Sequence, residues 1–364
     1  MEDSYERIGQ LLDELRKVEE GPEQTNILRQ VIRHADLIGD RQYQFRFRAA
    51  FVESAFYSGN ADEMLVALSW CLACYDESPE DFGSPEVAVQ LMSYALGYIT
   101  NFPTVSRNKI NGLLDDFEKR CLQASIGLRR MYLHRTRIAF WTGEIESAKK
   151  YFASFLNTSR RGGWSEDYER VFRVDYYAHV GDDAMACQEA ESVVAQTGRA
   201  EGPQFWVCAF VIASLVRQNR LDDAKRSFER GYEASRSNPK YLGLVSKHMN
   251  YLLSVGELQR AFELFQRHAV WADESSVLDN RFRFCAVGWR LFQLFSENGT
   301  KTLKVQLPKR LTPRVEVSEF EPTELAAWFE SETIRIAKLF NQRNGNDWYT
   351  KSTDRIMNLT PKSA

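Results

Sequence analysis

The sequence predicts an all-α fold, a solenoid built from helix-turn-helix repeats. One short pattern occurs four times between Arg129 and His268, at steps of 38, 38 and 37 residues, and its copies begin at Gly143, Gly181, Asn219 and Gly256. Each copy has a turn residue first, an Ala at the sixth position and, in three copies, a Phe at the tenth. A fixed period of this length is typical of repeats that bury their apolar faces only against neighbouring repeats.

The residue types in each copy predict where one helix ends and the next begins. A Gly or Asn permits the left-handed backbone that closes a helix. Acidic residues such as Glu144 and Asp222 then favour the first turn of the next helix, because a negative charge there interacts well with the helix dipole. The small side chain at the sixth position allows two helices to approach closely, and it is present in every copy as Ala148, Ala186, Ala224 and Ala261.

This arrangement resembles the second helix of a tetratricopeptide repeat, and the preceding segments MYLHRTRIAFWTG and FVIASLVRQN resemble its first helix. The resemblance is clearest over residues 127–271. The period exceeds the 34 residues of that family, a closing Pro is missing, and Ala190 stands where Phe is expected. The resemblance implies a right-handed superhelix whose first helices line a concave groove for a peptide or a partner protein.

The residues before the four clear repeats continue the hairpin pattern. Apolar residues at helical spacing predict helices on both sides of the break at 21–22, and residues 59–60 form the turn of a later hairpin. Two Ser-Pro pairs, at 78–79 and 84–85, bracket a loop, since Pro is poorly tolerated inside a helix but suits its first turn. A degenerate hairpin follows, with its turn at 102–104.

The C-terminal part of the chain changes character after Asn298-Gly299. Residues 300–321 contain two prolines and alternate apolar with charged residues in LKVQLP and RVEVS, which favours a short extended strap or hairpin. Residues 322–358 predict a pair of helices that caps the array of residues 1–299, because a solenoid must cover its last apolar face. This segment also resembles bacterial tetratricopeptide proteins of unassigned role.

Composition argues against several classes of protein. The net charge of −3, from 47 basic and 50 acidic residues, gives no overall field that favours nucleic acid or an anionic membrane. No apolar run is long enough to span a bilayer, and the acidic amphipathic N-terminus differs from a secretory signal. Six cysteines spread over 364 residues suit core positions in a reducing compartment. We therefore expect a cytoplasmic protein without disulfides; its oligomeric state stays open.

Motifs for catalysis, metals or cofactors are absent from the sequence. Cys71 and Cys74 have the spacing of a thioredoxin-type motif, but that motif needs the first thiol at a helix N-terminus, and here both fall inside a helix that begins near Ala61. There is no second CxxC and no closely spaced His pair for zinc. No nucleotide-binding glycine loop, GxSxG or HExxH occurs. We expect no enzyme activity, no cofactor and no metal site.

The register of the tetratricopeptide resemblance places a set of mixed charged and aromatic residues on the concave face. Arginine and aromatic side chains are common anchors in binding surfaces, so this set is the candidate site for a protein or peptide of unknown identity. The candidates are Arg130, Leu133, Arg137, Phe140, Tyr168, Asp175, Trp206, Ser246 and Asn250.

An alternative hypothesis is a nucleic-acid-binding helical repeat with an arginine-rich groove, in which arginines follow the phosphates and aromatic rings stack on bases. The neutral charge balance weighs against it. Its candidate residues are Arg46, Arg48, Arg129, Arg130, Arg135, Arg137, Arg170, Arg173, Arg281 and Arg283.

Truncation after Gly299 should expose the aromatic face of the preceding helix and cause aggregation or loss of cooperative unfolding. Each large apolar side chain returned to water costs about 1.5–3 kcal/mol. Light scattering and thermal unfolding of the truncated chain measure the effect. A soluble truncated protein with unchanged thermal stability would show instead that residues 300–364 form an independent appendage.

Overall fold

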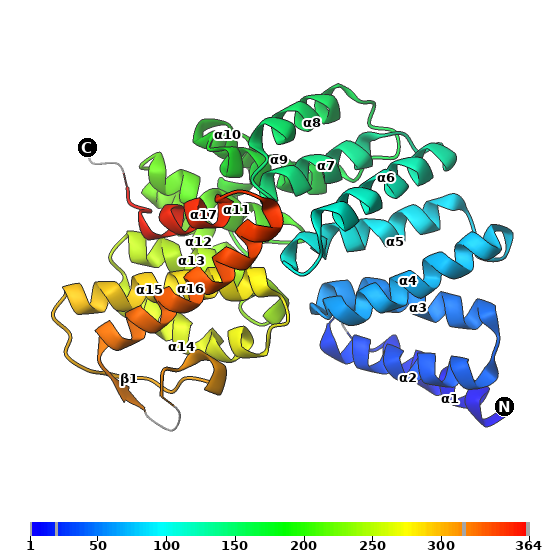
Figure 1. The fold of residues 1–364 in the computed structure, drawn as a ribbon, viewed down its shortest axis with the longest axis horizontal. Helices are drawn as coiled ribbons and strands as arrows, with labels where there is room; N and C mark the ends of the chain where they lie inside the picture. Colours follow the sequence, from blue (N-terminus) through cyan, green and yellow to red (C-terminus); the bar gives the residue numbers. More distant parts are fainter. Residues whose placement is uncertain (1, 19–20, 315–317, 362–364) are drawn as a thin grey trace. The chain divides into compact units, whose positions relative to one another are not determined.

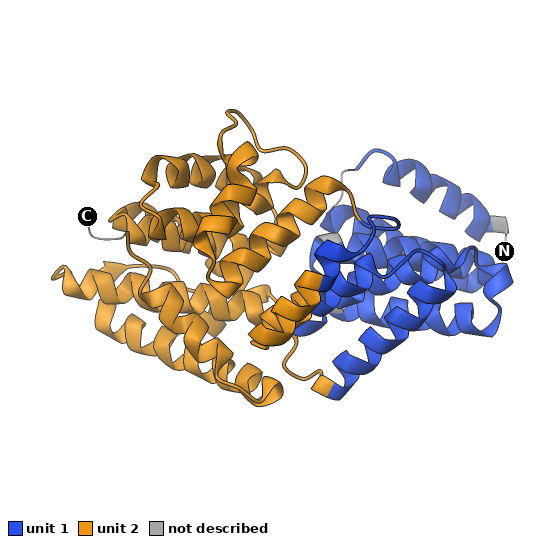
Figure 2. Ribbon diagram, turned by 90° about the horizontal axis from the view of Figure 1, so that it is seen from above, with its two compact units in different colours: residues 1–100, 108–135, 154–163 blue, residues 101–107, 136–153, 164–364 orange. Residues whose placement is uncertain are grey.

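The computed structural model describes residues 2–18, 21–314 and 318–361, and within these ranges it consists mainly of α-helices joined by short turns (Figure 1). The chain divides into two compact units (Figure 2). Unit 1 comprises residues 1–100, 108–135 and 154–163, and unit 2 comprises residues 101–107, 136–153 and 164–364. The predicted all-α class with helix-turn-helix organisation is confirmed.

In unit 1 the first five helices pack in succession. Contacts join α1 to α2, α2 to α3, α3 to α4, and α4 to α5. Asp40 caps the third helix through hydrogen bonds from the backbone N–H groups of Gln42 and Tyr43. The helices are α1 (Glu2–Leu15), α2 (Pro22–Ile38), α3 (Arg41–Ser58), α4 (Ala61–Glu77), α5 (Pro85–Tyr98) and α6 (Arg107–Gln123), and the two units share α7 (Arg129–Trp141) and α8 (Ile145–Asn157).

The four repeat turns have one common backbone geometry. Their turn residues Gly143, Gly181, Asn219 and Gly256 all have positive φ angles, from 58° to 87°. In each turn the next backbone N–H donates to a carbonyl five residues earlier, which closes the preceding helix in the manner of a Schellman motif. These bonds are Glu144 to Ala139 (2.8 Å), Asp182 to Tyr177 (2.9 Å), Arg220 to Leu215 (2.9 Å) and Glu257 to Leu252 (2.9 Å).

Unit 2 arranges its hairpins in two layers. The first helices contact one another in order, α9 with α11, α11 with α13 and α13 with α15, while the second helices lie behind them. The repeat alanines are fully buried between the layers, as their small size predicted. The helices are α9 (Glu166–Val180), α10 (Asp183–Val194), α11 (Gln204–Arg217), α12 (Leu221–Ser235), α13 (Leu242–Ser254), α14 (Leu258–Glu274) and α15 (Leu278–Glu297).

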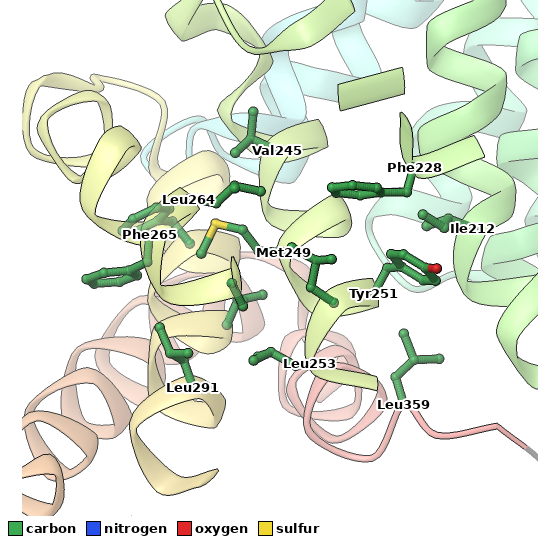
Figure 3. Close-up of a cluster of buried hydrophobic side chains, with 14 of the residues drawn as sticks. Ile212, Phe228, Val245, Met249, Tyr251, Leu253, Leu264, Phe265, Leu291 and Leu359 are labelled. Atoms are coloured by element: carbon green, nitrogen blue, oxygen red, sulfur yellow. The ribbon is translucent and has the colours of Figure 1, made fainter. Parts of the chain in front are cut away.

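The apolar core of unit 2 joins the repeats to the end of the chain. Side chains from α11 to α15 form one buried cluster, and Leu359, which follows the last helix, belongs to it (Figure 3). Leu359 is only 3% exposed. Leu359 is therefore part of the folded core of unit 2.

The strap and the C-terminal helices complete unit 2. Strand β1 (Leu303–Lys304) pairs antiparallel with β2 (Glu319–Phe320), and residues 315–317 of the RVEVS segment lie outside the described residues. Helix α16 (Pro322–Asn344) runs along α15, where Phe329 stacks on Phe292 with a centroid distance of 5.4 Å. Gly288 permits this approach, since a Cβ there would lie only 3.1 Å from the Phe329 ring.

Helix α17 (Trp348–Met357) turns back from α16 at Gly345 and reaches the turn between α7 and α8. The sequence predicted that this segment packs on the helix around 278–296, and both α16 and α17 contact α15. The turn before α17 makes a second contact, in which the side-chain amide of Asn346 donates to the carbonyl of Thr142 at 2.8 Å. Trp348 packs directly on Gly143, where an added Cβ would lie 2.5 Å from the Trp348 Cβ. Gly143 therefore serves both the turn and the close approach of α17.

Replacing Gly143 with Ala should lower the free energy of unfolding more than replacing Gly181 with Ala. Both glycines have φ near 85°, a backbone that costs an L-residue about 1–2 kcal/mol. A Cβ at Gly181 meets nothing within 4 Å, whereas one at Gly143 overlaps Trp348, which adds about 1–3 kcal/mol of overpacking. Urea denaturation of the two variants measures the difference. Equal losses would contradict the close packing of α17 on this turn.

Candidate functional site

A cavity of about 580 Å³ lies in unit 2, among the first helices α9, α11, α13 and α15, with α17 and its following residues on one side. Its polar lining contains four cations and two carboxylates, Lys247, Arg217, Arg283, Arg355, Asp183 and Asp354. Its apolar lining includes Phe210, Ile212, Val287, Ile356 and Leu359. A volume in this range, with an apolar lining and a few polar groups, is typical of ligand-binding pockets.

Two of the cavity's arginines are neutralised by aspartates. Arg217 makes a bidentate ion pair with Asp183, with both N–O distances at 2.7 Å. Arg283 donates to Asp279 at 2.7 and 3.3 Å, and the hydroxyl of Tyr349 donates to the same carboxylate at 2.9 Å. Burial next to this carboxylate raises the pKa of Tyr349. These pairs fix both guanidinium groups and leave them little net charge to offer.

Lys247 differs from these arginines because no carboxylate lies within ion-pair distance of its ammonium group in the part of the chain that the structure describes. The Nζ atom lies 5.4 Å from the ring centroid of Phe210. Burial, and then the charge of Arg283, lower the pKa of Lys247 to about 8, although Asp175 and Asp279 act in the opposite direction. Lys247 is thus a partly buried cation at the edge of a cavity.

Asp175, the carboxylate on the neighbouring helix α9, is already engaged by other groups. Its Oδ2 accepts a hydrogen bond from Trp141 Nε1 at 3.3 Å, and its Oδ1 lies 3.1 Å from His179 Nδ1. Burial raises the pKa of Asp175, but His179, Lys247 and other cations outweigh it, so that the net shift is downward. An ionised Asp175 therefore helps to hold the charge of Lys247 without contacting it.

A buried arginine fastens the end of α17 beside the cavity. Arg290 is 6% exposed, and it donates to the Oδ1 of Asn250 at 2.6 Å and to the carbonyls of Ile356 and Leu359 at 3.2 and 2.7 Å. Burial lowers its pKa to about 10. On the other side of the cavity, Arg355 of α17 donates to the carbonyl of His179 at 3.0 Å. These bonds hold α17 and the residues after it against α9 and α15, and Arg290 also links α15 to α13.

The predicted concave-face residues fall into separate groups. Ser246 and Asn250 line the cavity, and Asp175 lies next to the lining residue His179. Tyr168 and Trp206 contact each other edge to face with centroids 6.1 Å apart, on the first helices α9 and α11.

The other four candidates lie on α7. Leu133 and Phe140 are 3% and 0% exposed, so their side chains belong to the interior of the fold. Arg130 donates to Gln90 at 3.1 Å in unit 1, and Arg137 lies over the Trp141 ring in unit 2.

The residues selected from the sequence did not include Lys247 or the residues of α17 that line the cavity. Lys247 follows the selected Ser246 and precedes Asn250 by three positions, so the helical period alone places it near the same face. Arg283 entered only the nucleic-acid hypothesis. The sequence predicted a capping helix pair over residues 322–358, but the repeat pattern gave no signal that α17 would line a cavity.

Most arginines of the nucleic-acid hypothesis are occupied within the protein. Carboxylates lie within 2.6–3.4 Å of six of them, which reduces the positive charge available to phosphates. The pairs are Arg48 with Asp36, Arg135 with Asp115 and Glu118, Arg170 with Asp167, Arg173 with Glu166 and Glu189, Arg281 with Glu332, and Arg283 with Asp279.

The six cysteines are all buried and not in disulfides. Burial raises the pKa of Cys71 to about 12, so its thiol is protonated at neutral pH. Among the described residues, no group of three or more His, Cys, Asp or Glu side chains is placed to hold a metal ion. No helix within these ranges has the length and apolar character needed to cross a membrane.

The fold and the cavity together define an all-α helical-repeat protein with a pocket on its layer of first helices. No protein-family model matches the chain, and no curated protein sequence matches it. A solved structure, the apo form of the quorum sensor NprR from B. thuringiensis, is similar to this chain at 13% sequence identity, with a TM-score of 0.41, over 98% of this chain and 99% of that chain. At this TM-score the similarity supports no inference about function.

Replacing Lys247 with Met should raise the free energy of unfolding near neutral pH by about 1–2 kcal/mol, because the variant no longer holds an unpaired ammonium partly away from water. The folded chain releases the Lys247 proton near pH 8, but the unfolded chain holds it up to a pKa near 10.5. Stability of the parent protein therefore rises with pH across that window, and the advantage of the variant should shrink there.

Urea denaturation at neutral and at alkaline pH measures this effect. The matched control is Lys225→Met on α12, where the lysine is exposed. A Lys247→Met variant that is less stable than the parent at neutral pH would show that the ammonium stabilises the fold.

Proposed function

We propose that this protein is a non-catalytic scaffold that binds a peptide or a segment of a partner protein on the layer of first helices in unit 2. The observation that carries the proposal is the cavity among α9, α11, α13 and α15. It lies on the helices that the repeat pattern assigned to the concave face, and it combines apolar walls with fixed charges. Such a lining provides both affinity and orientation for a bound chain.

A row of aromatic side chains extends from this cavity along α11. Trp206 and Phe210 are four residues apart, so they lie on one face of the helix. Trp206 also contacts Tyr168 and Tyr241, with centroids 6.1 and 6.4 Å away. All four rings are only partly buried. Aromatic rings of this kind are frequent anchors at interfaces, since they offer a large contact area at little cost in conformational entropy.

The chemistry of the site supports binding rather than catalysis. Two of its arginines are held in ion pairs with aspartates, and Arg355 is held by the carbonyl of His179. In unit 1, burial raises the pKa of the Cys71 thiol. A scaffold requires only complementary contacts, which these fixed groups supply. We infer that the partner is a segment with apolar side chains spaced to meet the cavity and the aromatic row.

Substituting Phe210 by Asp should weaken peptide binding by about tenfold or more, equivalent to about 1.4 kcal/mol, because it removes an apolar wall and adds a charge. A displayed library of random peptides provides the probe, and the enriched peptides are then titrated against each variant by calorimetry. Val270→Asp is the matched control, since Val270 is an exposed side chain on the second helix α14.

Two results would count against this assignment. Enriched peptides that bind both variants as tightly as the parent would place the site elsewhere. If the folded parent protein retains no peptide from the library, the proposal that this protein binds peptides is wrong.

A further inference from the structure

Two of the four cations that line the cavity, Lys247 and Arg355, have no carboxylate within ion-pair distance among the described residues. Arg355 donates to the carbonyl of His179 and lies over the Trp348 ring, whereas no hydrogen bond holds the ammonium group of Lys247 in the described part of the chain. Asp183 pairs with Arg217, and Asp279 pairs with Arg283 and accepts from Tyr349. Asp175 accepts from Trp141, and its other oxygen lies 3.1 Å from His179 Nδ1, which is hydrogen-bonded to the Asp175 backbone carbonyl. Each of these carboxylates has a closer partner than Lys247. Holding an ammonium group in such surroundings costs free energy, so its presence at the cavity lacks a structural explanation.

A second donor lies one helical turn away on the same face of α13. Asn250 is three residues after Lys247, and its carbonyl oxygen already accepts from Arg290. Its amide nitrogen has no hydrogen-bond partner among the residues described, and the side chain lines the cavity. An ammonium and an amide N–H₂ group on one face form a pair of donors that matches the two oxygens of a carboxylate.

The walls around these donors are apolar. Phe210 and Ile212 come from α11, Val287 from α15, and Ile356 and Leu359 from α17 and the residues after it. A ligand that satisfies the whole cavity therefore carries a negative group at one end and an apolar body at the other. The volume of about 580 Å³ suits a compact molecule or the last residues of a chain.

We propose that this cavity binds an organic carboxylate joined to an apolar group, with the carboxylate between Lys247 and Asn250 and the apolar body against Phe210 and Val287. This inference rests on one part of the proposed function, namely that the layer of first helices is the binding face. Two sources supply this chemistry, a small free acid and the C-terminus of a peptide that ends in an apolar residue.

Binding of such an anion should weaken at alkaline pH, because Lys247 loses its charge there. Besides His179 on α9, charged groups from every surrounding element lie around the cavity or act on this lysine. They are Asp175 on α9, Asp183 on α10, Arg217 on α11, Asp279 and Arg283 on α15, and Asp354 and Arg355 on α17.

The test uses phenylacetate and phenylacetamide, which share an apolar body and differ in charge, together with a short peptide ending in Phe as the free acid or as the amide. Mass spectrometry follows acetylation of Lys247 in the full-length protein, and calorimetry measures affinity. We expect each acid to protect Lys247 and to bind about tenfold more tightly than its amide. In Lys247→Met the preference for the acid should disappear, in Lys247→Arg it should persist, and in Lys225→Met it should be unchanged.

The outcomes separate the two proposals. Equal affinity for acid and amide in the parent protein, or a preference that survives Lys247→Met, overturns carboxylate recognition and leaves peptide binding intact. Failure of all four probes to protect Lys247, while library peptides bind through Phe210, also overturns it. Protection by phenylacetate but not by the peptide with a free C-terminal carboxylate supports the proposal and identifies a small acid as the ligand. Protection by that peptide but not by phenylacetate supports the proposal and identifies a peptide C-terminus as the ligand.

Discussion

The structure of unit 2 depends on one backbone constraint, the positive φ angle at each repeat turn. Gly143, Gly181, Asn219 and Gly256 adopt this conformation, and the same five-residue hydrogen bond closes the helix before each of them. Because every turn reverses the chain in the same way, the first helices gather in one layer and the second helices in another. The repeat alanines then allow the layers to approach, and the core in Figure 3 is the result.

The return of α17 converts this layer of helices into a bounded cavity. At one end Trp348 requires a glycine at the α7–α8 turn, and at the other Arg290 holds the last carbonyls of the helix. The guanidinium group of Arg290 suits the C-terminal end of α17, because the last carbonyls of a helix have no hydrogen-bond partners within the helix. Around the cavity Arg217 pairs with Asp183, Arg283 pairs with Asp279, and Arg355 is held by a backbone carbonyl, whereas Lys247 has no such partner among the described residues.

The candidate site was only partly predictable from the sequence. Ser246 and Asn250 were found because a periodic pattern fixes which residues share a face of a helix, and both line the cavity. The same pattern also selected Leu133 and Phe140, which are buried, because periodicity separates the faces of a helix but does not show which neighbour covers each face. Lys247 was adjacent to the selected residues, yet its importance depends on partners from α9 and α15 that lie far away in the sequence.

The sequence by itself determined the class of fold, the positions of the repeat turns and the alanines buried between the two layers. These features are local: a glycine or asparagine at a turn, an alanine at a fixed offset and apolar residues at helical spacing act through neighbours in the chain. Only the tertiary structure decided the path of α17, the pairing of the aspartates with arginines and the isolation of the Lys247 ammonium. Those features depend on distances between residues that no repeat period connects, since Trp348 meets Gly143, and Arg290 meets Leu359, only after the chain has folded back on itself.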